Sequence, residues 1–294
     1  MGTGDDAEPP PAGRRVTRRH VLIAGTAAAV GVAAAGGWAV VDTVPSVRRR
    51  LHAAGLLDGP DHAVPQVEGI PAVAYGVLDA PDGRRYRWGR WTREGGEPEL
   101  RLVCLHPRGG DEAYPFRTLG VHRFVANAGL PWTVASLAGG DDYWHPRADG
   151  ADPLGALTDG LLPMLAPRGG PLAVLGWSMG GYGALLLAER PPVGLVAAVA
   201  SSPAVWASFG GAAAGAFDDA ADFRAHDVLA GADALRGGPS VRVDCGADDV
   251  FAGTSRRLLE AVPGAAGGIH PGFHDEGTWR SFLPAQIGWI GSGR

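Results

Sequence analysis

Lysine is missing from this chain, and all 26 basic residues are arginines. Without a lysine amine the protein cannot form a Schiff base, a Ser-Lys dyad or the phosphate-binding lysine of a P-loop. Cysteine is nearly as scarce, with only Cys104 and Cys245. Each lies in an apolar run typical of a buried strand, in distant parts of the chain and without the Cys-x-x-Cys spacing of a metal site. We therefore expect two buried free thiols, with no disulfide and no metal centre.

Charge is also sparse in this sequence. Charged residues make up 19% of the 294 residues, and the net charge is −5. The body of the chain has no arginine-rich stripe that could capture phosphates, so nucleic acid is excluded as a partner. Hydrophobic residues, at 46%, are enough to bury the core of one large domain. The composition predicts one globular domain behind an N-terminal extension.

The extension has the order of a twin-arginine export signal. A polar start rich in Pro, Gly and Asp leads to Arg18 and Arg19, and residues 21–41 then carry no charge. The run is also long enough for a membrane anchor, but its many Ala and Gly residues make it weakly hydrophobic. We expect an exported protein, extracellular or in the cell envelope, either cleaved or tethered by residues 21–41, which would be its only membrane contact. The expected divisions are a signal or anchor segment at 1–44, a linker at 45–69 and the main globular domain at 70–294.

The body alternates between short apolar strands and helix-length segments. Residues 72–79 and 84–91 flank the turn signal at residues 81–83, which predicts an antiparallel hairpin at one edge of a sheet. From Leu100 onward the alternation continues through helical segments expected at 116–128 and 223–235 to the final predicted helix, 279–290. Repeated strand and helix units of this kind predict an α/β fold, with a mostly parallel central sheet covered by helices on both faces.

One motif carries chemistry. Gly176-Trp177-Ser178-Met179-Gly180 joins the apolar strand 172–175 to a predicted helix at 179–189. A serine at such a strand-to-helix turn is exposed as a nucleophile, and the following helix supplies amide donors beside it. The plainer alternative is a glycine-rich turn in which Ser178 only caps the helix. The strand before the motif and the helix after it favour the nucleophile.

A serine nucleophile needs a base and an acid, which should follow it as acid and then histidine. The run after the predicted strand 241–245 offers Asp248 and Asp249, and we expect Asp249 to be the acid, with Asp248 as the alternative. His274 lies in a loop ahead of the last helix and is the expected base, whereas His270, on a probable strand, is expected to be structural. His274 would take the proton of Ser178, and the acid would orient the imidazole.

The negative oxygen that forms on an attacked carbonyl needs backbone donors. The amide of Met179, at the start of the predicted helix, is one candidate. The second should come from the loop after the strand 100–105, where Pro107 has no amide hydrogen; Arg108 is the expected donor, with Gly109 behind it.

Four ordered motifs resemble the esterase family that includes esterase D, feruloyl esterases and the mycobacterial antigen 85 mycolyltransferases. They are Leu105-His106-x-Arg108-Gly109-Gly110, Gly176-Trp177-Ser178-Met179-Gly180-Gly181-Tyr182-Gly183, Cys245-Gly246-x-x-Asp249 and His274-Asp275-x-x-x-Trp279-Arg280. The resemblance implies an α/β-hydrolase fold without a large lid domain, a Ser-Asp-His triad and acyl-ester chemistry without a cofactor. It carries the triad to Ser178, Asp249 and His274, and an oxyanion amide to Arg108. The sequence departs from the family at Pro107 and at Val250, where members often have Gly and Pro.

The loop after the strand 132–137 should lie at the active-site edge of the sheet. We expect its Tyr143 and Trp144 to line a substrate pocket together with Trp177 and Trp206, although ordinary loop packing would explain the same residues. The leading hypothesis is a serine esterase acting on a small-molecule or lipid ester. An acyltransferase would use the same catalytic residues, and an inactive envelope binding protein is the alternative from another class.

Overall fold

The computed structural model describes residues 44–93, 97–165 and 169–293. The predicted export segment lies outside these ranges, apart from its last residue, Val44. Among the described residues, no helix combines the length and the apolar character needed to cross a membrane. The compact unit that begins at Arg49 contains the whole sheet.

The described strands form one eight-stranded sheet in the order β1-β2-β4-β3-β5-β6-β7-β8. Strands β1 and β2 pair as the predicted antiparallel hairpin, and β2 also pairs antiparallel with β4. The remaining six strands, β3 to β8, run parallel to one another. Their bounds are β1 (Ala74–Asp79), β2 (Arg85–Thr92), β3 (Leu100–Leu105), β4 (Trp132–Leu137), β5 (Leu172–Trp177), β6 (Leu195–Ser201), β7 (Ser240–Gly246) and β8 (Ala266–His270).

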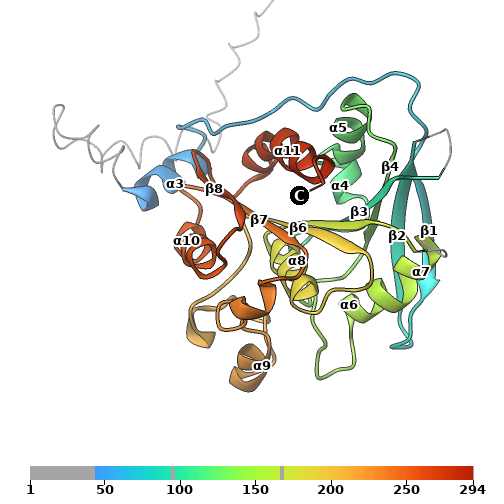
Figure 1. Cartoon of the computed structure of the whole chain (residues 1–294). Helices are drawn as coiled ribbons and strands as arrows, with labels where there is room; N and C mark the ends of the chain where they lie inside the picture. The colour runs from blue at the N-terminus through green and yellow to red at the C-terminus, as the bar shows by residue number, and fades with distance from the viewer. Residues whose placement is uncertain (1–43, 94–96, 166–168, 294) are drawn as a thin grey trace, which may run out of the picture. The chain divides into compact units, whose positions relative to one another are not determined.

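Helices cover both faces of the sheet, with α4, α5 and α11 on one side and α8 and α10 on the other (Figure 1). The described helices are α3 (Pro45–Ala53), α4 (Tyr114–Arg117), α5 (Val121–Asn127), α6 (Pro153–Gly155), the π-helix η1 (Ala156–Leu161), α7 (Leu162–Leu165), α8 (Met179–Glu189), the 3₁₀-helix η2 (Phe209–Gly211), α9 (Ala220–Ala225), the 3₁₀-helix η3 (Ala232–Leu235), α10 (Ala252–Ala261) and α11 (Glu276–Gly291). The described segment between β6 and β7 holds only short helices, without a separate lid domain.

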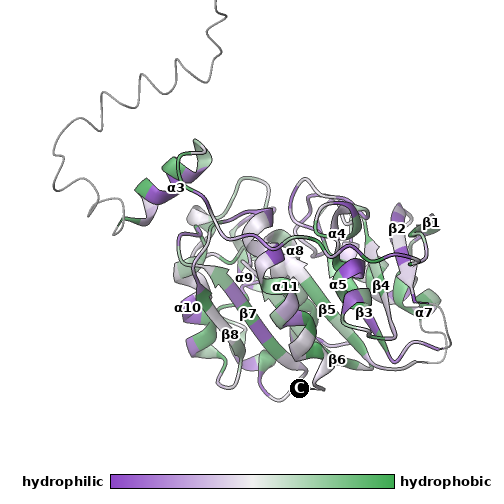
Figure 2. Cartoon of the chain, turned by 90° about the horizontal axis from the view of Figure 1, so that it is seen from above, coloured by the Kyte–Doolittle hydropathy of each residue, from purple (hydrophilic) through white to green (hydrophobic). Residues whose placement is uncertain are grey.

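Side chains that alternate along each strand contribute to a hydrophobic core on each face of the sheet. In β3, Leu102 and Cys104 belong to the core under α5 and α11, whereas Val103 and Leu105 belong to the core under α8. Every residue of β3, β4 and β5 is buried, as parallel strands covered on both sides require. The mostly hydrophobic residues of the central strand β5, green in Figure 2, agree with that burial. Cys104 and Cys245 are both buried and free, as predicted.

The segment before β1 makes specific contacts with the start of α11. The carboxylate of Asp61 pairs with the guanidinium of Arg280 at 2.8 Å, and the ring of His52 stacks on Phe273 with centroids 3.9 Å apart. These contacts anchor residues 52–61 beside the loop that carries His274.

Candidate active site

The nucleophile candidate sits on a sharp turn. Ser178 joins β5 to α8 with φ 53° and ψ −115°, a conformation that few non-glycine residues adopt. Two glycines make the turn possible: a Cβ on Gly176 would overlap the backbone of Gly180, and a Cβ on Gly180 would overlap the carbonyl of Leu105. The N–H of Ser178 donates to Ser201 O at 2.9 Å, which ties the turn to the neighbouring strand. Strain held in place by packing is typical of a nucleophile elbow.

The structure brings Ser178, His274 and Asp249 into one hydrogen-bonded chain. His274 Nε2 lies 2.9 Å from Ser178 Oγ, and His274 Nδ1 lies 2.8 Å from Asp249 Oδ2. An ionised carboxylate can only accept, so Nδ1 carries the hydrogen and Nε2 presents its lone pair to the serine hydroxyl. The serine can therefore hand its proton directly to the histidine.

The backbone selects Asp249 over its neighbour Asp248. Asp249 has 2% of its surface exposed, and its Oδ1 accepts the N–H of Phe251 at 2.8 Å, which leaves Oδ2 for His274. Asp248 contacts the loop ahead of α11 through its backbone, because its N–H donates to Gly272 O at 2.9 Å. Two adjacent aspartates thus have different tasks, and only the carboxylate of Asp249 is bonded to His274.

Two aromatic rings hold the imidazole of His274. Phe251 and Trp279 contact it edge-on, with centroids 5.3 Å and 5.2 Å away. Nothing in the sequence marks Phe251 as part of the site, because its role depends on the turn after β7 bringing it over His274. Both rings limit the freedom of the histidine and keep it in line with Ser178.

The other late histidine belongs to a separate buried network. His270 lies at the end of β8, as expected, and its Nε2 is 3.0 Å from Asp244 Oδ1. Arg242 and Gln286 donate to the second oxygen of Asp244 at 2.7 Å and 2.9 Å. Burial acts to raise the pKa of Asp244, but the hydrogen bonds from His270 and Arg242 outweigh it and hold that pKa below its usual value. This network joins β7, β8 and α11.

A buried histidine sets the orientation of the predicted oxyanion loop. His106 Nε2 accepts the N–H of Gly139 at 2.9 Å, so the hydrogen sits on Nδ1, which donates to Pro107 O at 2.8 Å. Burial lowers the pKa of His106, which keeps the ring neutral in this tautomer. The N–H of Gly110 also donates to Pro107 O, at 2.9 Å. In a trans peptide the N–H points away from the C=O, so these bonds fix the direction of the Arg108 amide.

The structure distinguishes between the two candidate oxyanion donors of this loop, the amides of Arg108 and Gly109. The N–H of Gly109 is engaged by Asp141 Oδ1 at 2.7 Å, which leaves Arg108 as the better donor. Met179, the other predicted donor, is the first residue of α8. An N–H in the first turn of a helix has no intrahelical partner, so it can serve a ligand. The close approach of Gly180 to the carbonyls of residues 105 and 106 keeps this loop against the start of α8.

The four predicted pocket residues differ in exposure. Trp144 and Trp177 have no exposed surface and belong to the two cores, Trp144 packing onto Gly183 of α8. Tyr143 and Trp206 contact each other with centroids 5.3 Å apart, and Trp206 is only partly buried. Tyr143 is only 4% exposed and belongs to a core as well. A buried side chain cannot line an accessible surface, so the pocket hypothesis is restricted to Trp206, with Tyr143 packed behind it.

No family model matches the chain, and no curated protein matches its sequence. Solved structures do match. A fluorophosphonate-binding serine hydrolase of Staphylococcus aureus superposes with a TM-score of 0.64 at 18% identity, over 76% of this chain and 99% of that chain. A ferulic acid esterase gives 0.61 at 18% identity, over 76% and 98%. The MPT51 protein of Mycobacterium tuberculosis gives 0.61 at 21% identity, over 76% and 100%.

At these identities the likeness establishes the fold. The alignments cover nearly all of each neighbour, so the likeness applies to the whole domain of each neighbour and not to a fragment of it. The prediction of an α/β-hydrolase fold is confirmed.

Proposed function

We propose that the chain is a serine esterase that cleaves carboxylic esters through an acyl-Ser178 intermediate. One observation carries the proposal: Ser178, His274 and Asp249 form a continuous chain of hydrogen bonds of 2.9 Å and 2.8 Å. They come from three separate loops at the carboxyl ends of β5 and β7 and ahead of α11. An inactive binding protein would have no need for this convergence.

The geometry supports a two-stage reaction. As Ser178 Oγ bonds to the ester carbonyl carbon, its proton passes to His274 Nε2, and Asp249 stabilises the imidazolium. The carbonyl oxygen becomes negative and accepts from the amides of Met179 and Arg108, each worth about 3 kcal/mol in the transition state. Collapse breaks the bond to the alcohol, which leaves with the proton from His274. A water molecule then repeats these steps on the acyl-serine, releasing the acid and restoring Ser178.

The names of the structural neighbours support ester chemistry as the starting point. One is a ferulic acid esterase and another a fluorophosphonate-binding serine hydrolase. Trp206, which is partly buried and contacts Tyr143, offers an aromatic surface for the acyl or alcohol part of a small-molecule or lipid ester. We include export through the segment 1–44 in the proposal, on the strength of its paired arginines and uncharged run.

The direct test is hydrolysis of p-nitrophenyl esters of increasing acyl length by the full chain. The parent should hydrolyse at least one of them, and Ser178→Ala should lose about ten-thousand-fold or more in kcat/KM. Ser202→Ala is a matched control, because Ser202 is also buried, also has positive φ (48°, against 53° at Ser178) and follows the neighbouring strand β6. A parent without activity across the series, or equal losses in both variants, would contradict the proposal.

The same acyl-serine could pass its acyl group to an alcohol. Product analysis with trehalose added distinguishes hydrolysis from acyl transfer, since hydrolysis releases the acyl group only as free acid. A trehalose ester as the main product would replace the esterase proposal by the acyltransferase alternative.

A further inference from the structure

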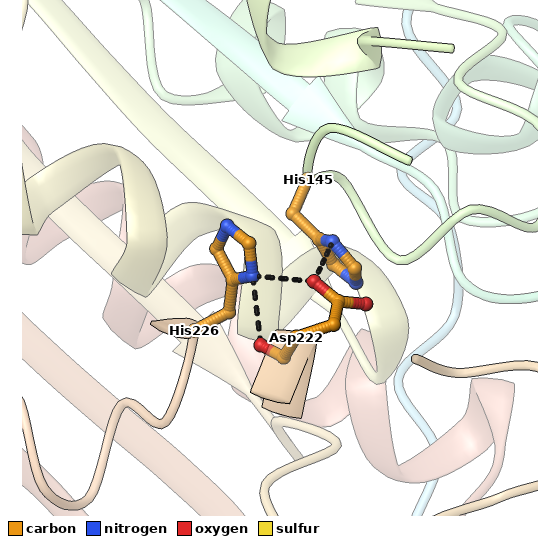
Figure 3. Close-up of side chains that lie close together, drawn as sticks. All are labelled: His145, Asp222 and His226. Carbon is orange, nitrogen blue, oxygen red and sulfur yellow. Dashed lines mark hydrogen bonds and ion pairs between the residues drawn. The ribbon is translucent and has the colours of Figure 1, made fainter. Parts of the chain in front are cut away.

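Three side chains outside the triad converge on one point (Figure 3). His145 comes from the loop after β4, Asp222 from α9, and His226 follows Asp222 by four residues. His145 Nδ1 lies 3.6 Å from Asp222 Oδ1, and His226 Nδ1 lies 2.9 Å from the same oxygen. Two imidazole nitrogens and a carboxylate oxygen held this close together are a ligand set for a divalent metal ion.

The hydrogen bonds of His145 leave a lone pair without a partner. Its Nε2 lies 3.0 Å from the carbonyl oxygen of Ala216, and its Nδ1 lies 3.1 Å from that of Pro146. A neutral imidazole has only one N–H, so one of its nitrogens faces an acceptor with a lone pair. Asp222 Oδ1 adds a third acceptor beside Nδ1. A fully buried imidazolium is costly, whereas a metal ion on Nδ1 would satisfy the nitrogen and the carboxylate together.

The surrounding contacts match those of a built metal site. With the hydrogen of His145 on Nε2, the ring donates to Ala216 O, and Nδ1 is free for a metal. The carboxylate of Asp222 is held by its other oxygen, Oδ2, which accepts the N–H of Asp218 at 2.8 Å. A carbonyl behind the ligating histidine and a donor behind the ligating carboxylate are the outer contacts that orient metal ligands.

An ion can reach the cluster from a cavity. The space has a volume of about 340 Å³. His226, with 23% of its side chain exposed, lies on its wall, whereas His145 borders the space with only 1% of its side chain exposed, so an ion would enter past His226. Asp152, Asp159 and Glu189 line it as well, and Glu189 Oε1 is buried without a hydrogen-bond partner. These three carboxyl groups outnumber the one arginine on the wall, Arg190, which favours the entry of a cation.

We propose that His145 Nδ1, Asp222 Oδ1 and His226 Nδ1 bind one zinc ion. The two imidazoles and single carboxylate suit zinc better than calcium or magnesium, which prefer all-oxygen ligand sets. For binding, the hydrogen of His226 must leave Nδ1, which lies 2.9 Å from Asp222 Oδ1 and 3.0 Å from the backbone oxygen of Asp222, and move to Nε2. This is a change of tautomer without a change of charge.

The ion would join two loops at the active-site end of the sheet. One carries Tyr143 just before His145, and the other carries Trp206 and continues into α9. Arg147 and Asp218 already connect the same segments through an ion pair of 2.8 Å. A zinc ion would fasten them at a second point, so its role is structural and does not depend on the proposed esterase activity.

The test is zinc binding to the full chain after treatment with a chelator. Isothermal titration with zinc chloride should give one tight site per chain, and the Tm should rise by roughly 5 °C or more at saturating zinc. His226→Ala and Asp222→Asn should lose the site and the Tm shift, whereas His62→Ala, an exposed histidine elsewhere, should keep both.

Cobalt provides a check that does not depend on the stability of the variants. Co(II) added to the parent should give the intense visible absorption of a tetrahedral nitrogen and oxygen ligand set, and zinc should displace it. Absence of zinc binding in the parent, or an unchanged site in both His226→Ala and Asp222→Asn, overturns the proposal. In the first case the cluster is only a hydrogen-bonded group.

Discussion

The substitution Asp249→Asn tests the assignment of the acid with the least change in shape. In the parent, Asp249 Oδ1 accepts from the N–H of Phe251 and Oδ2 accepts from His274 Nδ1, both at 2.8 Å. An asparagine must keep its oxygen toward the N–H of Phe251, because its NH₂ group cannot accept there. The NH₂ group therefore faces His274 and forces Nδ1 to become the acceptor.

The consequence is a histidine with its hydrogen on the wrong nitrogen. Nε2 then carries the hydrogen, donates to Ser178 Oγ and can no longer take its proton. Loss of the correct tautomer costs about ten-thousand-fold in kcat, or ~5.5 kcal/mol in transition-state stabilisation. The side chain of Asp249 is fully buried, so solvent cannot substitute for the missing acceptor.

The assay is steady-state hydrolysis of the best p-nitrophenyl ester, normalised to folded protein by circular dichroism. Asp248→Asn is the control, since it makes the same chemical change one residue earlier, and it should stay within about tenfold of the parent. Our reasoning is refuted if Asp249→Asn keeps more than a tenth of the activity, or if Asp248→Asn falls as far.

Three further outcomes follow from individual groups. His106→Ala should lower kcat roughly ten- to hundredfold with a smaller change in KM, because the Arg108 amide loses its orientation. His122→Ala, which removes a buried histidine elsewhere, should leave kcat unchanged. Equal losses in the two variants would show that His106 does not orient the Arg108 amide. Burial raises the pKa of Glu189 from 4.5 to about 7, so its contribution to stability is fully present below pH 4.5 and is lost as the pH rises through 7. Glu189→Gln should therefore gain roughly 1 kcal/mol at pH 8 in urea unfolding, after allowance for solvent screening, and flatten this pH dependence; an unchanged profile would contradict the burial argument. Replacing Arg18 and Arg19 by glutamine should retain the protein inside the cell, as fractionation would show, and continued export would refute the signal hypothesis.

The order of strands and helices could be predicted from the sequence because buried parallel strands and amphipathic helices have distinct periods. Interruptions of helices were harder to foresee. The helical segment expected at 116–128 is divided into α4 and α5 by Gly120, whose φ is 68°. The helical region expected at 223–235 is also divided, into α9 and the 3₁₀-helix η3, without a glycine of positive φ between them. Such breaks depend on tertiary packing, which overrides local preference.

The loops limited what the sequence could say about the site. Ser178 and His274 were identifiable because each stands at a marked junction, but the choice between Asp248 and Asp249 depends on which carboxylate the turn after β7 directs inward. The burial of Trp144 could not be predicted from the sequence either. Tyr143 and Trp144 both have positive φ, at 51° and 58°, and no pattern predicts that conformation for two consecutive aromatic residues. The left-handed turn directs the Trp144 ring into the core.

The central claim is that Ser178 is a nucleophile activated by His274. Its most direct test is the mass of the full chain after reaction with a fluorophosphonate, followed by peptide mapping. The account predicts one adduct per chain on the peptide that contains Ser178, absent in Ser178→Ala and present in Ser202→Ala. An unlabelled parent protein, or an adduct on any other residue, would contradict it.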